Sequence, residues 1–444
     1  MILRAIFVCF FLVLSSVAKS QDAFSILKGD KSKKIRFKLV NNLIFIPVDV
    51  NGTELTFLLD TGVSKPIIFS FPFIEEVLKI EDTEKIYIRG LGGGEPVEAI
   101  KSKNNRILAG NVINTNQELY IVFDASLNFA PRLGMPVHGI LGSDFFENFV
   151  VEINYSSKYI RMYNPETYSY KNCRKCTLID IEMHNDKPYL QGEIEIKSKK
   201  IPVKLLIDSG GSDSLWLFEN DSINLQDKKF FEDFLGHGLS GSVYGKRSKL
   251  KSFTLADFKF LNPNVAFPDT LSFHPSARIK DRNGSISGNI LKRFNLIVDY
   301  KNKKIQLKKN RYFKEKFSYN KSGMELEHSG IRLLQEEVHD FQNNNPFSPT
   351  AENAGTVNLL LERRYRLSVK PAYAIVELRK NSPAEKAGLQ LGDVIIRING
   401  KETHRMELQQ VMAMFYEEEG SMIRVKIERD GKLMVFNFKL ENLL

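Results

Sequence analysis

The stretch that decides the fold of this 444-residue chain is Phe57-Leu58-Leu59-Asp60-Thr61-Gly62-Val63-Ser64. An aspartate directly after three large apolar residues occupies a costly position, because burial disfavours a charged carboxylate that is not hydrogen-bonded. A single Asp-Thr-Gly is weak evidence, since all three residues are common in turns. The chain, however, repeats the pattern as Leu205-Leu206-Ile207-Asp208-Ser209-Gly210-Gly211-Ser212. The repetition turns a weak motif into a strong one.

The two copies share landmarks further along the chain. Gly142 follows Asp60 by 82 residues and Gly288 follows Asp208 by 80 residues, each inside a short apolar strand pattern. Each half then closes with a hairpin pattern, Phe149 to Tyr163 in the first and Phe294 to Leu307 in the second. Strand-like runs and tight turns such as Asn51-Gly52 fill both halves. We therefore expect an internal duplication and a mainly β fold with two lobes related by a pseudo-two-fold axis.

Composition places the chain among globular proteins and excludes a nucleic-acid role. It is 43% hydrophobic and 26% charged, and its formal charge of +10 is spread over lysine-rich hairpin edges such as Lys301 to Lys309. No basic stripe is interleaved with exposed aromatic residues, so we expect no nucleic-acid partner.

The first residues have the pattern of a secretory signal. Arg4 precedes a short apolar run, and small residues flank Lys19 in Ala18-Lys19-Ser20. We expect residues 1–20 to be removed before Gln21 and the mature chain to be exported, periplasmic or extracellular. No later stretch is apolar enough over the ~20 residues that a membrane helix requires, so the mature chain should have no transmembrane segment.

Two cysteines remain after this cleavage, Cys173 and Cys176 in Cys-Arg-Lys-Cys. A zinc site would need two further ligands, and the seven histidines show no paired spacing. In an exported chain a local disulfide is the better interpretation. We predict no metal and no cofactor.

The last part of the chain, residues 313–444, has another pattern. Ser382-Pro383-Ala384 begins a short helix that ends at Gly388, and Gly392-Asp393 turns into the strand Val394 to Ile398. A second helix carries one apolar stripe from Leu408 to Phe415. An inserted segment around 336–362, rich in asparagine, is expected to be a loop.

The paired aspartates predict acid–base chemistry. If the lobes meet at the axis, Asp60 and Asp208 share one proton, as in the aspartic-protease pair that is the standard example of such sharing. Small residues beside them would support the pair through backbone and hydroxyl groups: Thr61, Gly62, Ser64, Ser209, Gly210 and Ser212. Two glycine-rich tips would be mobile flaps over the cleft: Gly90, Leu91, Gly92, Gly93 and Gly94 in the first half, and Leu239, Ser240 and Gly241 in the second.

With Ile140-Leu141-Gly142, these motifs resemble a retropepsin-like aspartic peptidase of the pepsin clan with two lobes fused in one chain. The tail resembles a bacterial-type PDZ domain, a small β-barrel with two helices. The resemblance implies two six-stranded-type lobes of the acid protease barrel fold, at 21–165 and 166–312, followed by the PDZ domain at 313–444. It also implies a polypeptide substrate, hydrolysis by Asp60 and Asp208, and a monomer, since both catalytic halves lie in one chain.

The PDZ resemblance implies that a peptide or protein C-terminus adds as a strand to a groove. Two segments fit the loop that would bind its carboxylate, Gly323-Met324-Glu325-Leu326 and Gly330-Ile331-Arg332-Leu333. The second lobe departs from the family pattern, with Ile286-Ser287-Gly288 where two apolar residues are usual before glycine. Two other functions compete with hydrolysis: a peptide-binding protein that keeps the fold without turnover, and an envelope scaffold.

Overall fold

A computed structural model describes residues 23–27, 32–70, 74–124, 127–197, 199–226, 228–270, 281–338 and 364–444. It divides into two compact units, Met1–Asn320 with Asn442–Leu444, and Lys321–Glu441. The expected signal at 1–20 lies outside the described residues. The same is true of residues 339–363, most of the expected loop, whereas residues 336–338 belong to a strand. None of the helices in these ranges is long and apolar enough to cross a membrane.

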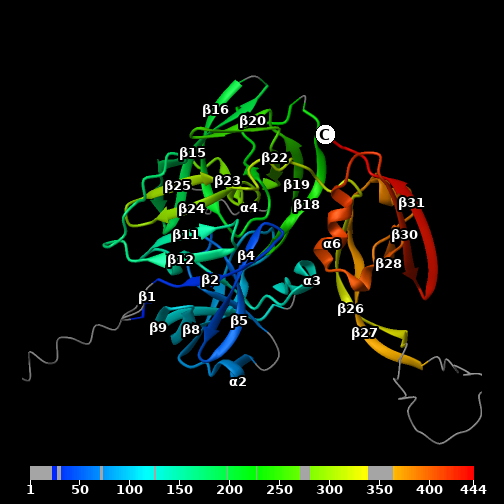
Figure 1. Ribbon diagram of the computed structural model, residues 1–444, viewed down its shortest axis with the longest axis horizontal. Helices are drawn as coiled ribbons and strands as arrows, with labels where there is room; N and C mark the ends of the chain where they lie inside the picture. Colours follow the sequence, from blue (N-terminus) through cyan, green and yellow to red (C-terminus); the bar gives the residue numbers. More distant parts are fainter. Residues whose placement is uncertain are drawn as a thin grey trace, which may run out of the picture. The chain divides into compact units, whose positions relative to one another are not determined.

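The prediction of a mainly β fold is confirmed (Figure 1). The first lobe is built on a sheet of nine strands within the described residues. Six of them close into a ring, because β9 pairs with both β6 and β8. The nine strands are β1 (Ser25–Ile26), β3 (Lys38–Val40), β4 (Leu43–Val50), β5 (Thr53–Leu59), β6 (Ile67–Phe69), β7 (Thr83–Ile88), β8 (Val97–Ala109), β9 (Val112–Val122) and β10 (Gly139–Leu141). Helices α2 (Ile74–Leu78) and α3 (Ala130–Leu133) and the 3₁₀ turn η2 (Ser143–Phe145) complete it.

The second lobe repeats this plan on a ten-stranded sheet, counted over the same described ranges. In both lobes the strand that leads to the aspartate is central, and a short strand pairs with it in parallel. The strands are β14 (Glu182–His184), β15 (Lys187–Ile196), β16 (Lys199–Asp208), β17 (Leu215–Leu217), β18 (Phe231–Gly238), β19 (Gly241–Lys249), β20 (Ser252–Leu255), β21 (Phe258–Leu261), β22 (Asn264–Pro268) and β23 (Gly284–Ser287), with helix α4 (Gly288–Leu291).

The lobes also share one six-stranded sheet, to which each contributes three strands. Its centre is the antiparallel pair β11 (Val150–Asn154) and β24 (Phe294–Asp299), where Glu152 lies opposite Ile297. Outward from this pair the order is mirrored: β12 (Tyr159–Tyr163) and β2 (Lys34–Arg36) on one side, β25 (Lys304–Lys309) and β13 (Cys176–Asp180) on the other. Figure 1 shows β11, β12, β24 and β25 side by side. The arrangement has the symmetry that a pseudo-two-fold axis requires.

The strand registers correct one landmark of the repeat. Leu141 pairs with Leu59, and Ile286 pairs with Ile207, in each case the residue before the aspartate. Gly142 therefore corresponds to Ser287, one residue earlier than the Gly288 to which the motifs had matched it. The backbone agrees, because Ser143 N–H donates to Val63 O (2.7 Å) and Gly288 N–H donates to Gly211 O (2.8 Å).

Unit 2 is a six-stranded sheet, over its described residues, with two α-helices. Its apolar core joins both helices to the sheet through residues such as Ala384, Leu408, Val411 and Phe415. The elements are β26 (Met324–Val338), β27 (Arg364–Leu378), α5 (Pro383–Lys386), β28 (Val394–Ile398), β29 (Lys401–Glu402), η5 (Thr403–Arg405), α6 (Leu408–Ala413), η6 (Met414–Tyr416), β30 (Met422–Arg429) and β31 (Lys432–Lys439).

The boundary between the units falls at Asn320 rather than at residue 312. Residues 313–319 belong to unit 1 because the buried Arg293 holds them. Its Nη1 donates to Glu315 O (2.7 Å), and its guanidinium lies 3.8 Å from the ring centre of Phe317. Tyr319 donates its hydroxyl proton to Ser248 O (2.5 Å).

Candidate active site

Each aspartate stands where a buried central strand ends. Asp60 follows β5, whose last three residues are buried, and Asp208 is the last residue of β16. The strand that pairs in parallel with β5 fixes the backbone of Asp60, because Asp60 N–H donates to Leu141 O (3.0 Å). The apolar runs therefore place both carboxylates at the ends of rigid strands.

Thr61 and Ser209 lock the two lobes together directly beneath the aspartates. Thr61 Oγ1 donates to Ile207 O (2.6 Å), and Ser209 Oγ donates to Leu59 O (2.9 Å). In return each hydroxyl oxygen accepts the backbone N–H of the other residue, both at 3.1 Å. Both side chains are buried. The sequence suggested hydrogen bonds across the axis at these residues, and the structure contains four of them.

The glycines of the two motifs bring the carboxyl groups together. A Cβ on Gly210 would lie 2.2 Å from Asp60 Cγ, and one on Gly62 would lie 3.5 Å from Asp208 Oδ1. Each aspartate therefore packs against the glycine of the other lobe. Backbone N–H groups hold the carboxylates: Gly62 donates to Asp60 Oδ1 (2.7 Å), and Gly210 and Gly211 donate to Asp208 Oδ1 (3.0 and 3.1 Å).

Burial raises the pKa values of both acids, and the neighbouring carboxyl group of Asp208 raises that of Asp60 further. Burial, followed by the nearby charge of Asp208, raises the pKa of Asp60 to about 7, against the lowering effects of the Gly62 N–H and of Lys187. Burial also raises the pKa of Asp208, while Arg282 and the two glycine N–H groups oppose the rise. Two neighbouring carboxyl groups in one buried site retain one proton between them over the range where isolated carboxyls would both be ionised. The pair can therefore hold one acid and one base at once.

Ser64 and Ser212, expected to orient the carboxylates, take part through their backbone. Ser64 O accepts from Asp144 N–H (3.3 Å), and Ser212 O accepts from Asn42 Nδ2 (2.7 Å). Among the described residues no hydrogen bond joins either hydroxyl to Asp60 or Asp208.

The expected flaps are the tips of two hairpins, β7–β8 and β18–β19, and the tips touch. Gly94 N–H donates to Ser240 O (2.8 Å), Ser240 N–H donates to Leu91 O (2.9 Å), and Gly90 N–H donates to Ser240 Oγ (3.1 Å). Gly92 has φ of +121°, and a Cβ there would lie 2.4 Å from the Ser240 carbonyl. Glycine is required at this contact.

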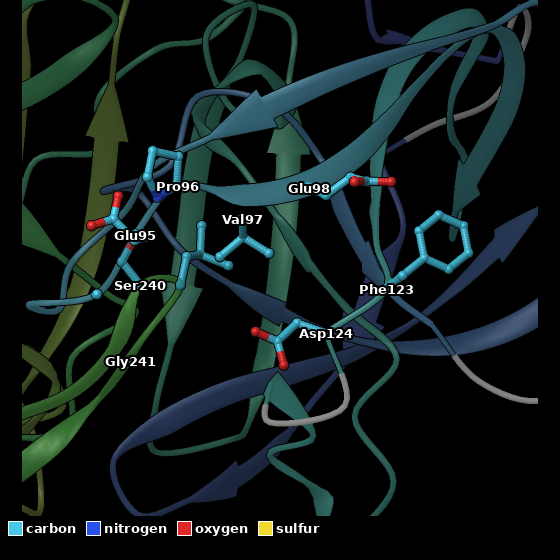
Figure 2. Close-up of a pocket in the computed structure, with 10 residues that line it drawn as sticks. Glu95, Pro96, Val97, Glu98, Phe123, Asp124, Ser240 and Gly241 are labelled. Atoms are coloured by element: carbon cyan, nitrogen blue, oxygen red, sulfur yellow. The ribbon is translucent and has the colours of Figure 1, made fainter.

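An open hollow of about 470 Å³ lies beside the flap tips. Its lining includes Glu95, Val97, Asp124 and Ser240, which Figure 2 shows as sticks. Since neither catalytic candidate lines it, the paired aspartates remain the chemical centre.

The structure also places the remaining predicted residues. Cys173 and Cys176 are joined by a disulfide. Of the two PDZ segments, Met324 and Leu326 are buried in the core that includes Leu408 and Val411 of α6. Ile331 and Leu333 lie beyond a register shift in the β26–β27 pair and are exposed. The first segment is thus the one whose side chains share a core with helix α6. Within the described ranges no group of three or more His, Cys, Asp or Glu side chains is arranged to hold a metal ion.

Three charged residues escaped prediction from the sequence: Lys187 and Arg282, whose charges act on the pair, and Asp144. The charge of Lys187 acts on both aspartates, and that of Arg282 acts on Asp208. Asp144 lies buried on the turn after β10 and accepts from Gln117 Nε2 (2.8 Å). The sequence could have indicated these residues only through an alignment of the two lobes, in which they stand at positions where the lobes differ in charge.

Comparison with known proteins agrees with this architecture. Residues 46–145 match the aspartyl protease family, and residues 375–429 match the PDZ domain family. The chain thus carries an aspartyl protease domain, which includes Asp60, and a PDZ domain.

Two curated relatives share a short stretch with this chain. It is 37% identical over 57 residues to the carboxy-terminal processing protease CtpA of Bacillus subtilis (strain 168), covering 13% of this chain and 12% of that protein. It is also 37% identical over 67 residues to CtpB of the same organism, covering 15% of this chain and 14% of CtpB. The chain therefore matches only about an eighth of each relative's length.

Proposed function

We propose, from the aspartyl protease domain and the PDZ domain of this chain, that the protein is an exported aspartic endopeptidase whose PDZ domain docks a peptide or protein C-terminus. The observation that carries the proposal is the pair Asp60 and Asp208, each packed against the glycine of the other lobe. The remaining steps follow from the geometry around the pair.

The ionised member of the pair would take a proton from a water molecule held between the carboxyl groups. The protonated member would donate to the carbonyl oxygen of the scissile peptide bond. The water oxygen then adds to the carbonyl carbon, and collapse of the tetrahedral intermediate, with proton transfer to the nitrogen, breaks the C–N bond. The raised pKa values of Asp60 and Asp208 support the proposal, because a shared proton supplies acid and base together.

The flaps fit the same role. The hydrogen bonds between the tips, at Gly94 and Ser240, must break to admit a polypeptide, and backbone N–H groups of the tips are then free to pair with it. A closing flap excludes water and holds the substrate in an extended conformation. An endopeptidase, which acts within a chain, needs such an opening.

The PDZ domain would bind an extended peptide as an added strand beside α6, where Met324 and Leu326 begin β26. Docking there would raise the local concentration of a substrate or recruit a regulator. This docking role is tested by comparing the cleavage rates of short and long substrates before and after a PDZ ligand is added as a separate peptide.

A second candidate function is peptide binding without turnover. The same cleft and flaps would serve it, and the open hollow beside the flap tips favours a bound chain in either case. The two functions differ only in whether the aspartates break the peptide bond.

The deciding experiment is a digest of casein and of a peptide library at acidic and neutral pH, with wild type beside Asp60→Asn and Asp208→Asn. If the two aspartates catalyse hydrolysis, wild type should cleave these substrates and neither variant should. Ser240→Ala, on a flap, serves as a variant that keeps both carboxyl groups. Equal cleavage by wild type and the Asn variants would overturn the assignment.

Export is tested separately. The protein recovered from cells should begin at Gln21 and should be found outside the cytoplasm. A chain that keeps residues 1–20 in the cytoplasm would contradict this part of the proposal.

A further inference from the structure

The two lobes present different side chains at matching positions beside the aspartates. Val40 pairs with Leu43 across the turn Asn41-Asn42, and His184 pairs with Lys187 across the turn Asn185-Asp186. All four turn residues have positive φ. Leu43 and Lys187 are therefore equivalent.

A second pair of equivalent positions follows from the strands that pair in parallel with β5 and β16. Gly139 pairs with Phe57 and Gly284 with Leu205, each three residues before the aspartate. Two residues upstream of these glycines stand Val137 and Arg282. At these equivalent positions the first lobe has Leu43 and Val137, whereas the second lobe has Lys187 and Arg282.

In the first lobe these positions form an apolar wall. Leu43 and Val137 are buried in one cluster with Phe45, Leu58 and Ile140, and Leu239 of the second flap packs against the cluster. The first lobe therefore has apolar side chains, and no charge, at these two positions. In the second lobe Ser285 stands where the first has Ile140, so the wall is more polar as well as charged.

The charges of both cations act on the paired aspartates. Tyr189 pairs with Leu206, so continuing the register by two residues puts Lys187 across from Asp208. Lys187 lowers the pKa values of Asp60 and Asp208, and burial lowers its own pKa. Arg282 is held in place by donation from Nε to Gly284 O (3.0 Å) and by the ring of Phe218, 5.4 Å away.

Neither cation forms an ion pair with a carboxylate within contact distance, in the part of the chain that the structure describes. Other partly buried cations of this unit do, such as Arg247, which contacts Asp213 and Asp233. A desolvated positive charge is costly without a counter-charge. A bound anion would supply the carboxylate contact that Lys187 and Arg282 lack among the described residues.

We propose, on the basis of the proposed peptidase function, that Lys187 and Arg282 form an anion subsite, so that the enzyme prefers polypeptides with an apolar side chain on one side of the scissile bond and Asp or Glu on the other. The apolar part of the substrate lies on Leu43, Val137 and Ile140. The acidic side chain lies on the second lobe.

The test is a peptide series with one apolar pair at the cleavage point and Glu, Gln or Lys placed singly at each of three positions on either side. Wild type should cleave one Glu peptide about tenfold better in kcat/KM than its Gln counterpart, the value of one charge-assisted contact. The Lys peptide should be the poorest. This increase in kcat/KM should occur only when Glu lies on one particular side of the scissile bond.

Variants then connect this ratio to the cations. The Glu/Gln ratio should fall to about one in Lys187→Met, survive in Lys187→Arg and invert towards Lys peptides in Lys187→Glu. Each variant is assayed at its own pH optimum, so that altered pKa values of the aspartates do not enter the ratio. Lys200→Met, at the far end of β16 and paired with Glu193 (3.1 Å), is the matched control and should keep the wild-type ratio.

The outcomes separate the subsite from the catalytic assignment. Cleavage of every peptide with a Glu/Gln ratio near one in wild type overturns the subsite and leaves the peptidase standing. A ratio unchanged in Lys187→Met also overturns it. If no peptide is cleaved, the peptidase assignment fails, and the subsite is judged by fluorescence anisotropy. Tighter binding of the Glu peptide than of the Gln peptide to Asp60→Asn supports the subsite, and equal binding overturns it.

Discussion

Among single residues, Asp60 and Asp208 would determine how the proposed peptidase activity depends on pH. Hydrolysis needs one proton on the pair, so activity falls at low pH, where both carboxyls are protonated, and at high pH, where both are ionised. Because the pKa of Asp60 is raised to about 7, the alkaline limb should lie near neutrality. A kcat/KM profile on a neutral peptide checks this, and activity undiminished to pH 9 or so would contradict it.

Asp144 gives a prediction about stability. Burial raises its pKa to about 7 from 3.8, so the native state holds a proton that the unfolded chain releases. The contribution of the protonated Asp144 to the free energy of unfolding is complete below about pH 4. It is lost as pH rises towards 7, and the free energy of unfolding then falls by on the order of 2–4 kcal/mol.

Asp144→Asn should remove this loss and raise the denaturant midpoint at pH 8 but hardly at pH 4. The amide still accepts the Gln117 hydrogen bond. Asp49→Asn, on a partly exposed ion pair with Arg106, is the control and should not show this pattern. A midpoint raised equally at both pH values would contradict the prediction.

The sequence predicted Asp60 and Asp208 because the motif occurs twice after apolar strands. It did not predict Lys187 or Arg282, since a lone lysine or arginine in a strand pattern has no signature. Their meaning depends on which residue stands opposite, and that follows from register. The same reason explains why the motif matched Gly142 to Gly288. The motif compares residue types, whereas strand pairing shows that Gly142 corresponds to Ser287.

Among the elements, the second flap is anchored by a buried arginine. Arg247 of β19 donates from Nε to Asp233 Oδ2 of β18 and from Nη1 to Asp213 Oδ1, both at 2.8 Å. Asp213 belongs to the loop just after the Asp208 motif. The base of the β18–β19 hairpin is therefore tied to the loop that follows Asp208.

Arg247→Met should lower the free energy of unfolding by about 3 kcal/mol, because it removes the guanidinium group that contacts two partly buried carboxylates. Lys246→Met, on the same strand but with an exposed ion pair to Glu219, should cost less than about 1 kcal/mol. Urea denaturation measures both. Similar small losses in the two variants would show that the aspartates find solvent or another partner.

At the level of the whole molecule, the end of unit 1 is set by a short segment after the last shared strand. Residues 313–319 are held by Arg293 and by the Tyr319 hydroxyl bond to Ser248. A chain that ends at Asn320 should fold and cleave short peptides, whereas one that ends at Tyr312 should lose more than about 3 kcal/mol through the exposed Arg293 site.

Thermal unfolding and a short-peptide assay on the two truncations test this. Equal stability would place the boundary at residue 312 after all. Loss of folding in both chains would show that unit 1 depends on unit 2.

The duplication let the sequence predict two lobes and a separate tail, but not the sheet that joins the lobes. β2 and β13 are short, and each pairs with a hairpin more than 100 residues away. Nothing local specifies such partners. The tail boundary was missed for a similar reason, because Phe317 and Tyr319 are specified by buried contacts rather than by a change in composition.

The mirrored six-stranded sheet has a consequence for the history and the freedom of this molecule. Three strands from each half around an axis is the arrangement that two identical chains would form at a dimer interface, here within one chain. A seam inside one polypeptide does not come apart on dilution. Because both halves lie in one chain, they can also differ in sequence, and a mutation changes one wall of the cleft and not both. Leu43 and Lys187 differ in this way, and a cleft with two different walls could distinguish an asymmetric peptide from its reverse, which a symmetric cleft could not.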